Sequence, residues 1–363
     1  MRRLIYIFII GLLLCSYTWA DGSRYASKSL LSEGKWVKIR VDKTGIYKLS
    51  YADLKNMGFS DPSKVSVHGY GGWPLDEDFS KEYIDDVPST PVWRGSDYLL
   101  FYGKGPVKWE YDSSSQTFVH TNNPYSLYGY YFVTDATPTN DMTSVAQASG
   151  ATNRITTYDD YLVHEQELVS LAKSGRELYG EDFSGATPRT LSTFSSIPGI
   201  TNEDAKVTMS FVSKVTSGTG VASLSINQSN VLDVSIRSNR EEYVKALEGV
   251  STAVWKGEKS EKNSVVVSYN SASHNNVRLN YVRLHFKRTL QPYGAYTFFR
   301  SIASIGNVSR FVVQGANANT LVFDVTDAQR VRLMETELNG SELTFSIPAG
   351  TLREFVLVRT DQS

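Results

Sequence analysis

The sequence predicts a mainly β protein, in which an aromatic-rich N-terminal β domain precedes a jelly-roll-like β-sandwich and helices are few and short. Tyrosine and phenylalanine, which favour strands, are abundant, with 22 and 16 copies among 363 residues. Short segments in which apolar and polar residues alternate recur along the chain, and Gly and Pro separate them. Several short strands joined by polar turns favour a sandwich.

Residues 1–20 have the pattern of a signal peptide. Arg2 and Arg3 precede an apolar run over residues 4–14, and the small residue Ala20 suits cleavage by signal peptidase. A helix that spans a bilayer needs about 20 apolar residues, and no segment of the sequence approaches that length. We therefore expect cleavage after Ala20, export, and a mature chain without a transmembrane segment.

The single cysteine, Cys15, lies inside this leader. After cleavage the chain would have no thiol, which excludes an intrachain disulfide, a Cys nucleophile and a thiolate metal ligand. The alternative, a lipidated N-terminus at Cys15, is disfavoured because Leu14 is larger than the small residue that this processing requires.

The charge balance excludes nucleic acid as a partner. Cleavage would remove two of the 37 basic residues and none of the 38 acidic ones, which leaves a small net negative charge. A nucleic-acid-binding surface needs an excess of Lys and Arg.

Residues 24–138 are predicted to form the aromatic-rich N-terminal β domain. Alternation over residues 35–41 and 46–49, with Lys43-Thr44-Gly45 between them, indicates a hairpin. Ser50 with Asp53 forms a capping box for a short helix over residues 51–57, and Gly58 ends it. The further strands expected in this domain lie at residues 65–68, 98–102, 108–111 and 128–134.

The polar stretch over residues 139–156 is interpreted as a linker. A connecting helix over residues 157–175 is predicted to follow, because Thr157 pairs with Asp160 as a capping box and apolar residues recur at helical spacing. Ser174-Gly175 would end this helix.

Residues 176–363 contain the strands expected to form the β-sandwich. The segment over residues 277–287 changes phase, because Val277 and Leu279 point one way and Val282 and Leu284 then take over. A one-residue slip of this kind predicts a β-bulge. The other expected strands lie at residues 207–211, 232–236, 265–267, 321–325, 343–347 and 354–358.

No catalytic residue is expected from the motifs. His68 precedes a glycine turn, where some cysteine peptidases hold their base, but the mature chain has no thiol to deprotonate. His164-Glu165 begins like a zinc-protease helix, yet Leu168 occupies the position of the second histidine. Asp324 and Asp327 flank a strand end, where aspartate usually satisfies turn amides.

Calcium binding by an acidic loop remains open. An acidic loop carries Asp76, Asp78, Asp85 and Asp86, with Glu77 and Glu82, and its oxygens are the ligands that Ca²⁺ prefers. The loop lacks the spacing of a known calcium loop, so a solvated, charge-repelled loop is the other interpretation. No other cofactor is expected.

Exposed tryptophans stack on sugar rings in many glycan-binding sandwiches. Trp93 and Trp109 are the candidates for such a role, alongside Trp36 and Trp73, and each is equally compatible with a place in the core or on a sheet face.

Motifs spread over most of the mature chain resemble the N-terminal region of the type IX secretion system sortases, cysteine peptidases related to the gingipains. They are LSEGKWVKI (31–39), KTGIYKL (43–49), DPSKV (61–65), DYLLFY (97–102), NPYS (123–126), YYF (130–132), KSGR (173–176), GEDF (180–183) and DVTD (324–327).

The resemblance implies an exported component of a Bacteroidetes-type secretion pathway, in the periplasm, in the outer membrane or at the cell surface. Its partners would be outer-membrane secretion components and secreted cargo. Full-length members remove C-terminal sorting domains from cargo and join the product to an anionic lipopolysaccharide. Their catalytic His and Cys lie in a following α/β domain, which would be expected to begin where this sequence ends, at Ser363, so no catalytic residue carries over.

The leading hypothesis is therefore a non-catalytic N-terminal region of a sortase-like surface protein, which supports processing and surface attachment of cargo. By this resemblance, residues 24–138 would be a propeptide-like β domain. The alternative is a free-standing adhesion or glycan-binding sandwich. A hydrolase that uses two carboxylates is a third hypothesis, but the sequence contains no convincing pair of acidic residues for it.

Overall fold

A computed structural model describes residues 25–78, 80–81, 84–171, 173, 177–185, 188–214, 217–238, 246–270 and 276–362. The predicted signal peptide with Cys15, the acidic-loop residue Glu82 and the predicted helix end Ser174-Gly175 lie outside these residues. Among the described residues, no helix is both long and apolar enough to cross a membrane.

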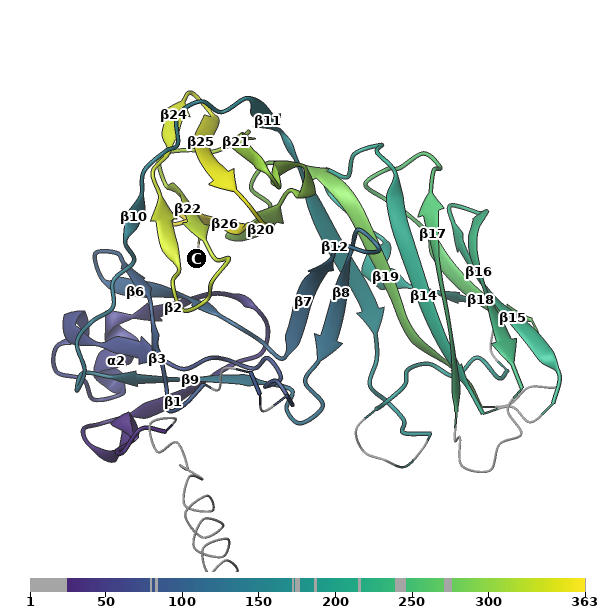
Figure 1. Cartoon of the computed structure of the whole chain (residues 1–363), viewed down its shortest axis with the longest axis horizontal. Coiled ribbons are helices and arrows are strands. Elements are labelled where there is room, and N and C mark those ends of the chain that lie inside the picture. The colour runs from purple at the N-terminus through teal and green to yellow at the C-terminus, as the bar shows by residue number, and fades with distance from the viewer. Residues whose placement is uncertain are drawn as a thin grey trace, which may run out of the picture.

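The chain is mainly β, as the sequence predicts, and it builds an N-terminal β module and two sandwiches (Figure 1). The N-terminal module has a four-stranded sheet and a three-stranded sheet that enclose one core. The first contains, in order, β1 (Val37–Val41), β9 (Gly129–Thr134), β3 (Ser66–His68) and β4 (Ser89–Thr90). The second contains β2 (Gly45–Ser50), β6 (Tyr98–Gly103) and β5 (Val92–Arg94).

The predicted short helix is confirmed as α2 (Tyr51–Asn56). The Ser50 hydroxyl accepts a hydrogen bond from the Asp53 amide at 3.0 Å, as expected of an N-cap residue. Gly58 follows with φ of 88°, the left-handed conformation that ends helices at glycine.

The predicted hairpin is wrong in its pairing, although both of its strands exist. β1 pairs with β9 and β2 pairs with β6, so residues 42–44 carry the chain from one sheet to the other. The physical reason is burial: Val41 from β1 and Tyr47 from β2 pack into the same core from opposite sheets. A hairpin would place both strands in one layer and leave that core half open.

One nine-stranded sheet runs through the rest of the molecule. Its order is β10 (Ser144–Val145), β23 (Arg332–Met334), β22 (Thr320–Asp324), β26 (Glu354–Arg359), β20 (Tyr296–Arg300), β12 (Thr157–Glu165), β19 (Val277–Thr289), β14 (Ala205–Ser213) and β17 (Leu247–Trp255).

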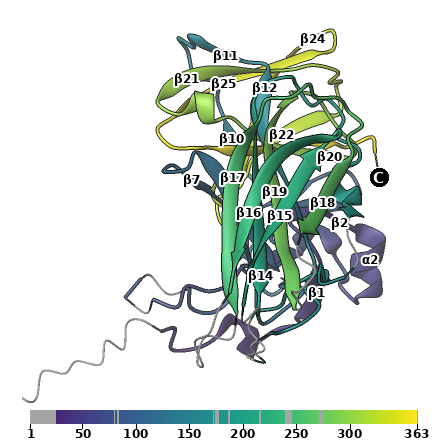
Figure 2. The same ribbon diagram turned by 90° about the vertical axis from the view of Figure 1, so that its right-hand side faces the viewer.

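Two smaller sheets cover the two halves of this large sheet and create two sandwiches. The first sandwich adds β13 (Arg189–Thr190), β18 (Val265–Asn270), β15 (Thr219–Ile226) and β16 (Ser229–Arg237) over β14, β17 and β19. The second adds β11 (Asn153–Ile155), β21 (Asn307–Val313), β25 (Glu342–Ala349) and β24 (Glu337–Asn339) over β20, β22 and β26. In Figure 2 the strands of the first sandwich run up the view, and β21 and β25 cross above them.

The second sandwich also packs against the N-terminal module. Phe355 and Leu357 of β26 face the sandwich core, whereas Val356 and Val358 face the other way and meet Leu100 of β6. Because β26 is buried on both sides, the N-terminal module is fixed on the outer face of the large sheet.

The connecting helix predicted over residues 157–175 is wrong, because β12 is a strand. It pairs with β19 along its whole length, from Thr157 opposite Thr289 to Glu165 opposite Tyr281. Its aromatic and β-branched side chains favour a strand, and long-range pairing overrides the apparent capping box. Leu168, predicted to lie on the apolar helix face, is exposed.

The predicted β-bulge is confirmed in β19. The register between β14 and β19 shifts between Ser210 and Phe211, which pair with Tyr281 and Leu279 and so leave Asn280 as the extra residue. The bulge allows Leu279 and Val282 both to face the first core.

Candidate functional site

A hairpin from the N-terminal part of the chain lies across the large sheet. It consists of β7 (Val107–Asp112) and β8 (Thr117–Asn122), and it lies beside β12 and β19 (Figure 1). Trp109 stacks on Tyr161 with ring centres 3.9 Å apart, and Phe118 packs edge-on against His285 at 5.0 Å. At the hairpin turn, the Lys206 ammonium donates a hydrogen bond to the Ser115 carbonyl at 2.6 Å.

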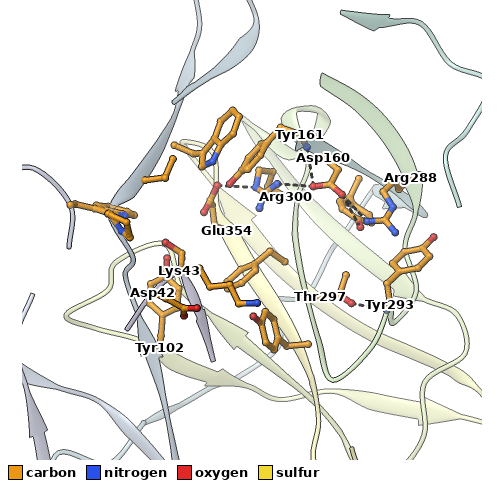
Figure 3. Close-up of a pocket in the computed structure, with 18 residues that line it drawn as sticks. Asp42, Lys43, Tyr102, Asp160, Tyr161, Arg288, Tyr293, Thr297, Arg300 and Glu354 are labelled. Atoms are coloured by element: carbon orange, nitrogen blue, oxygen red, sulfur yellow. Dashed lines mark hydrogen bonds and ion pairs between the residues drawn. The ribbon is translucent and has the colours of Figure 1, made fainter. Parts of the chain in front are cut away.

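A cavity of about 390 Å³ forms where this hairpin, the connection 42–44 and strands β12, β19, β20 and β26 meet (Figure 3). We call it the aromatic cavity, after its lining aromatic residues Trp73, Tyr102, Trp109, Tyr158, Tyr161, Tyr293, Tyr296 and Phe298. Three acidic and three basic residues complete its charged lining: Asp42, Asp160, Glu354, Lys43, Arg288 and Arg300.

Arg300 is the most deeply buried of these charges, with 1% of its surface exposed. Its Nε lies 2.8 Å from Glu354 Oε1, and its guanidinium lies 4.4 Å from the centre of the Tyr161 ring (Figure 3). Burial lowers the pKa of Arg300, but Tyr161 and the carboxylates of Glu354 and Asp160 outweigh burial and raise it. The guanidinium therefore stays charged inside the protein.

Arg288 and Asp160 form a second ion pair on the cavity wall. Arg288 donates to Asp160 Oδ2 at 2.8 Å, and its guanidinium stacks 3.7 Å from the centre of the Tyr293 ring. Charged side chains fixed against aromatic rings offer hydrogen bonds and flat apolar surface together, which suits a small polar ligand.

Asp159 lies behind the cavity and joins the two halves of the large sheet. Its carboxylate accepts hydrogen bonds from His285 Nε2 at 3.0 Å, Lys287 Nζ at 3.0 Å and the Ile302 amide at 2.7 Å. Burial raises the pKa of Asp159, but the hydrogen bond from His285 and the charge of Lys287 outweigh burial, so the net pKa is lowered.

The acidic residues considered for calcium lie in two separate settings. Asp76 forms an ion pair with Lys81 at 2.6 Å, and Asp78 accepts a hydrogen bond from the Ser80 amide. Asp85 and Asp86 instead accept hydrogen bonds from the chain at residues 26–30. Within the described part of the chain, no three His, Cys, Asp or Glu side chains are grouped closely enough to hold a metal ion.

The structure separates the two tryptophans considered for glycan binding. Trp109 lines the aromatic cavity together with Trp73. Trp93 packs on Tyr98, with ring centres 5.9 Å apart, at the contact between the N-terminal module and the large sheet. Trp36 packs edge-on against His68.

The other singled-out residues have structural partners. His68 is buried and contacts Thr137 Oγ1 at 2.8 Å, and His164 pairs with Glu181 at 2.7 Å. Asp324 pairs with Arg332 and Arg353.

Sequence reasoning missed Arg300, Glu354, Arg288 and Asp160 as parts of one site. The available signal was a set of charges inside otherwise apolar strand segments, such as Arg300 directly after Phe298-Phe299. Charged residues are rarely fully buried without a partner, so such positions point to an internal ion pair.

No model of a known protein family and no curated protein sequence matches the chain. The described residues define a protein with two β-sandwiches and a docked N-terminal β module, and a solved structure has a similar fold. The crystal structure of dimeric latent PorU from Porphyromonas gingivalis is similar with a TM-score of 0.86 and 30% sequence identity. The match covers 94% of this chain and 33% of that chain, so this chain has a PorU-like fold and spans about a third of the length of that protein.

Two further solved structures give no support to any fold assignment. Structures of the infectious bursal disease virus Gx and Gt strains match with TM-scores of 0.20 and 0.16 at 10% and 11% identity. These matches cover 92% and 91% of this chain, and 84% and 82% of the viral chains.

The Asp159 contacts give a pH-dependent contribution to stability. Because its pKa in the folded protein lies below the value of about 3.9 in an unfolded chain, the ionised carboxylate stabilises the fold above that pH. The contribution is lost as the pH falls through the folded pKa. We expect Asp159→Asn to lower the free energy of unfolding by about 3 kcal/mol at pH 7, and by much less at about pH 2.

Urea unfolding followed by circular dichroism from about pH 7 to pH 2 measures this difference. Asp135→Asn, at an exposed position, is the control and should match the wild type throughout. An Asp159→Asn curve that runs parallel to the wild-type curve down to the lowest pH would contradict the assignment.

Proposed function

We propose that this chain is a non-catalytic N-terminal region of a type IX sortase-like surface protein. The observation that carries the proposal is the PorU-like fold over 94% of the chain at 30% identity. The motifs at residues 31–39 and 97–102, which resemble the sortase family, lie in the N-terminal module and at its contact with the large sheet. The proposed location is outside the cytoplasm, in the periplasm, in the outer membrane or at the cell surface.

The proposed role is to support processing and surface attachment of secreted cargo. The N-terminal module is fixed on the large sheet through β26, so the chain offers a stiff support for a further domain or a partner. In cells that lack the gene, we propose that cargo keeps its C-terminal sorting domain and is not attached to the surface. Normal processing in such cells would argue against the role.

Purified protein without residues 1–20 is expected to leave a cargo C-terminal sorting domain intact. The reason is that no nucleophile with an adjacent base is present among the cavity residues, and four of the six charged ones, Asp160, Arg288, Arg300 and Glu354, are engaged in ion pairs. Intact mass spectrometry after prolonged incubation measures this. Cleavage that disappears in Glu354→Gln would contradict the proposal, because it would place catalysis in the aromatic cavity.

The aromatic cavity favours glycan binding as a second candidate function. Trp109 and Trp73 line it together with paired carboxylates and guanidinium groups, the combination that holds sugar rings by stacking and hydroxyl groups by hydrogen bonds. Trp93 does not line the cavity and therefore provides a matched tryptophan control.

If the aromatic cavity binds glycans, Trp73→Ala and Trp109→Ala should each weaken binding about two- to twelvefold, the effect of losing one stacking contact worth about 0.5 to 1.5 kcal/mol. Trp93→Ala should bind like the wild type. A glycan array followed by calorimetry on the best ligand measures this, and melting temperatures show whether each variant stays folded. Equal losses in Trp93→Ala and Trp109→Ala would remove the cavity from consideration.

A further inference from the structure

A second, larger cavity of about 730 Å³ lies at the open end of the β7–β8 hairpin. Pro106 and Val107 line both this cavity and the aromatic cavity. The larger cavity extends between the loop over residues 123–127, the end of β12, residues 177–179 and the start of β17. We call it the acidic groove, after Glu165, Glu167, Glu177 and Glu248 in its lining.

The rim of the groove displays large apolar side chains to solvent. Tyr125 is 78% exposed and Leu127 is 72% exposed, and both line the groove. The loop that carries them is held by its own hydrogen bonds: Asn123 accepts from the Tyr125 amide at 2.9 Å, and Ser126 donates to the Tyr128 carbonyl at 2.9 Å. Adjacent exposed apolar side chains on a fixed loop are typical of an interaction surface.

A further exposed apolar residue lies near the groove. Leu168 is 58% exposed, and its amide approaches the Tyr179 carbonyl at 3.2 Å. Tyr179 lines the groove. The lining of the groove therefore contains apolar side chains from two segments, Tyr125 and Leu127 in the loop and Leu178 beside Tyr179.

Within the described residues, the partners of the carboxylates are neutral groups or a histidine. Glu165 accepts from His120 Nε2 at 3.0 Å and, like Glu167, from the Asn122 amide group. Glu177 accepts from the Tyr179 hydroxyl at 3.0 Å. Glu248 accepts from Ser210 and Asn280. Among the residues that the structure describes, none of the four carboxylates forms an ion pair with Lys or Arg.

Burial and the negative charge of the groove raise the pKa values of two groups in it, Glu167 and Tyr179. Burial raises the pKa of Glu167, and the charge of Glu165 raises it further. Burial, the hydrogen bond to Glu177 and the charges of Glu177, Glu248 and Glu167 together raise the pKa of Tyr179 to about 12. A cation placed among these groups would relieve their repulsion.

We propose that the acidic groove binds an extended segment of a partner protein that carries a Lys or Arg close to a large apolar residue. The carboxylates are complementary to the cationic side chain, and Tyr125 and Leu127 supply apolar contact for its neighbour. A metal ion is a poor alternative, because within the described residues no three metal-ligating side chains are grouped. The inference uses the groove alone and is independent of the proposed sortase-like role.

An array of nine-residue peptides tests the proposal, with one Arg and one Phe at every spacing from one to four residues in a Gly-Ser background. Matched peptides replace Arg by Glu or Phe by Ser. Binding of the purified chain without residues 1–20 is measured by fluorescence anisotropy on the best peptides. We expect binding of Arg-Phe peptides, weakened by salt, and loss of binding in both sets of matched peptides.

Two groove variants and one control assign the site. Glu167→Gln with Glu177→Gln should weaken binding about tenfold, because each exposed charge pair contributes up to about fivefold, and Tyr125→Ser with Leu127→Ser should weaken it at least as much. Glu335→Gln, at an exposed position on the second sandwich, should leave binding unchanged. All five positions are exposed, and a melting temperature verifies that each variant is folded.

Four results would overturn the proposal. They are absence of binding by every peptide at millimolar concentration, equal binding of the Arg and Glu peptides, binding that survives both groove variants, and a loss in Glu335→Gln as large as in the groove variants. The last would indicate attraction to the whole acidic chain rather than to the groove.

Discussion

The fold depends on two buried charged residues, Asp159 and Arg300, which lie opposite each other in adjacent strands. Within the described residues, β12 and β20 pair at this single position, so the nine-stranded sheet is two shorter sheets joined there. Arg300 also lies directly opposite Glu354 in β26, and Asp159 holds the Ile302 amide that follows β20. Each residue is 1% exposed, so their charges require the partners that the two halves provide.

The same constraint creates the aromatic cavity and fixes its neighbours. Arg300 lies against Tyr161, and Tyr161 stacks on Trp109 of the β7–β8 hairpin. The hairpin therefore packs on side chains that lie next to the position where β12 and β20 pair. The acidic groove lies at the open end of that hairpin, next to the aromatic cavity, and there His120 and Asn122 hold Glu165. Two cavities of different chemistry, one aromatic with balanced charges and one acidic with an apolar rim, thus result from one docking arrangement.

The sequence predicts the strands well and their partners poorly, for a physical reason. Alternation, capping and phase are local, so α2 with its Ser50 cap, the bulge in β19 and most strand positions are confirmed. Pairing depends on burial between distant segments, which is why β1 and β2 join different sheets and why β12 is a strand rather than a helix. Trp109 was identifiable as a candidate, but its cavity requires side chains from eight separate segments.

Differential scanning calorimetry of Arg300→Met tests most directly whether the Asp159–Arg300 position couples the two halves of the large sheet. Arg310→Met, at an exposed side chain, is the control. Removing one partner of a buried ion pair costs about 3 to 5 kcal/mol, and here that cost falls where the two sandwiches meet. We expect one cooperative transition for the wild type and the control, and two separated transitions for Arg300→Met. A single transition for Arg300→Met at the wild-type melting temperature would contradict the account.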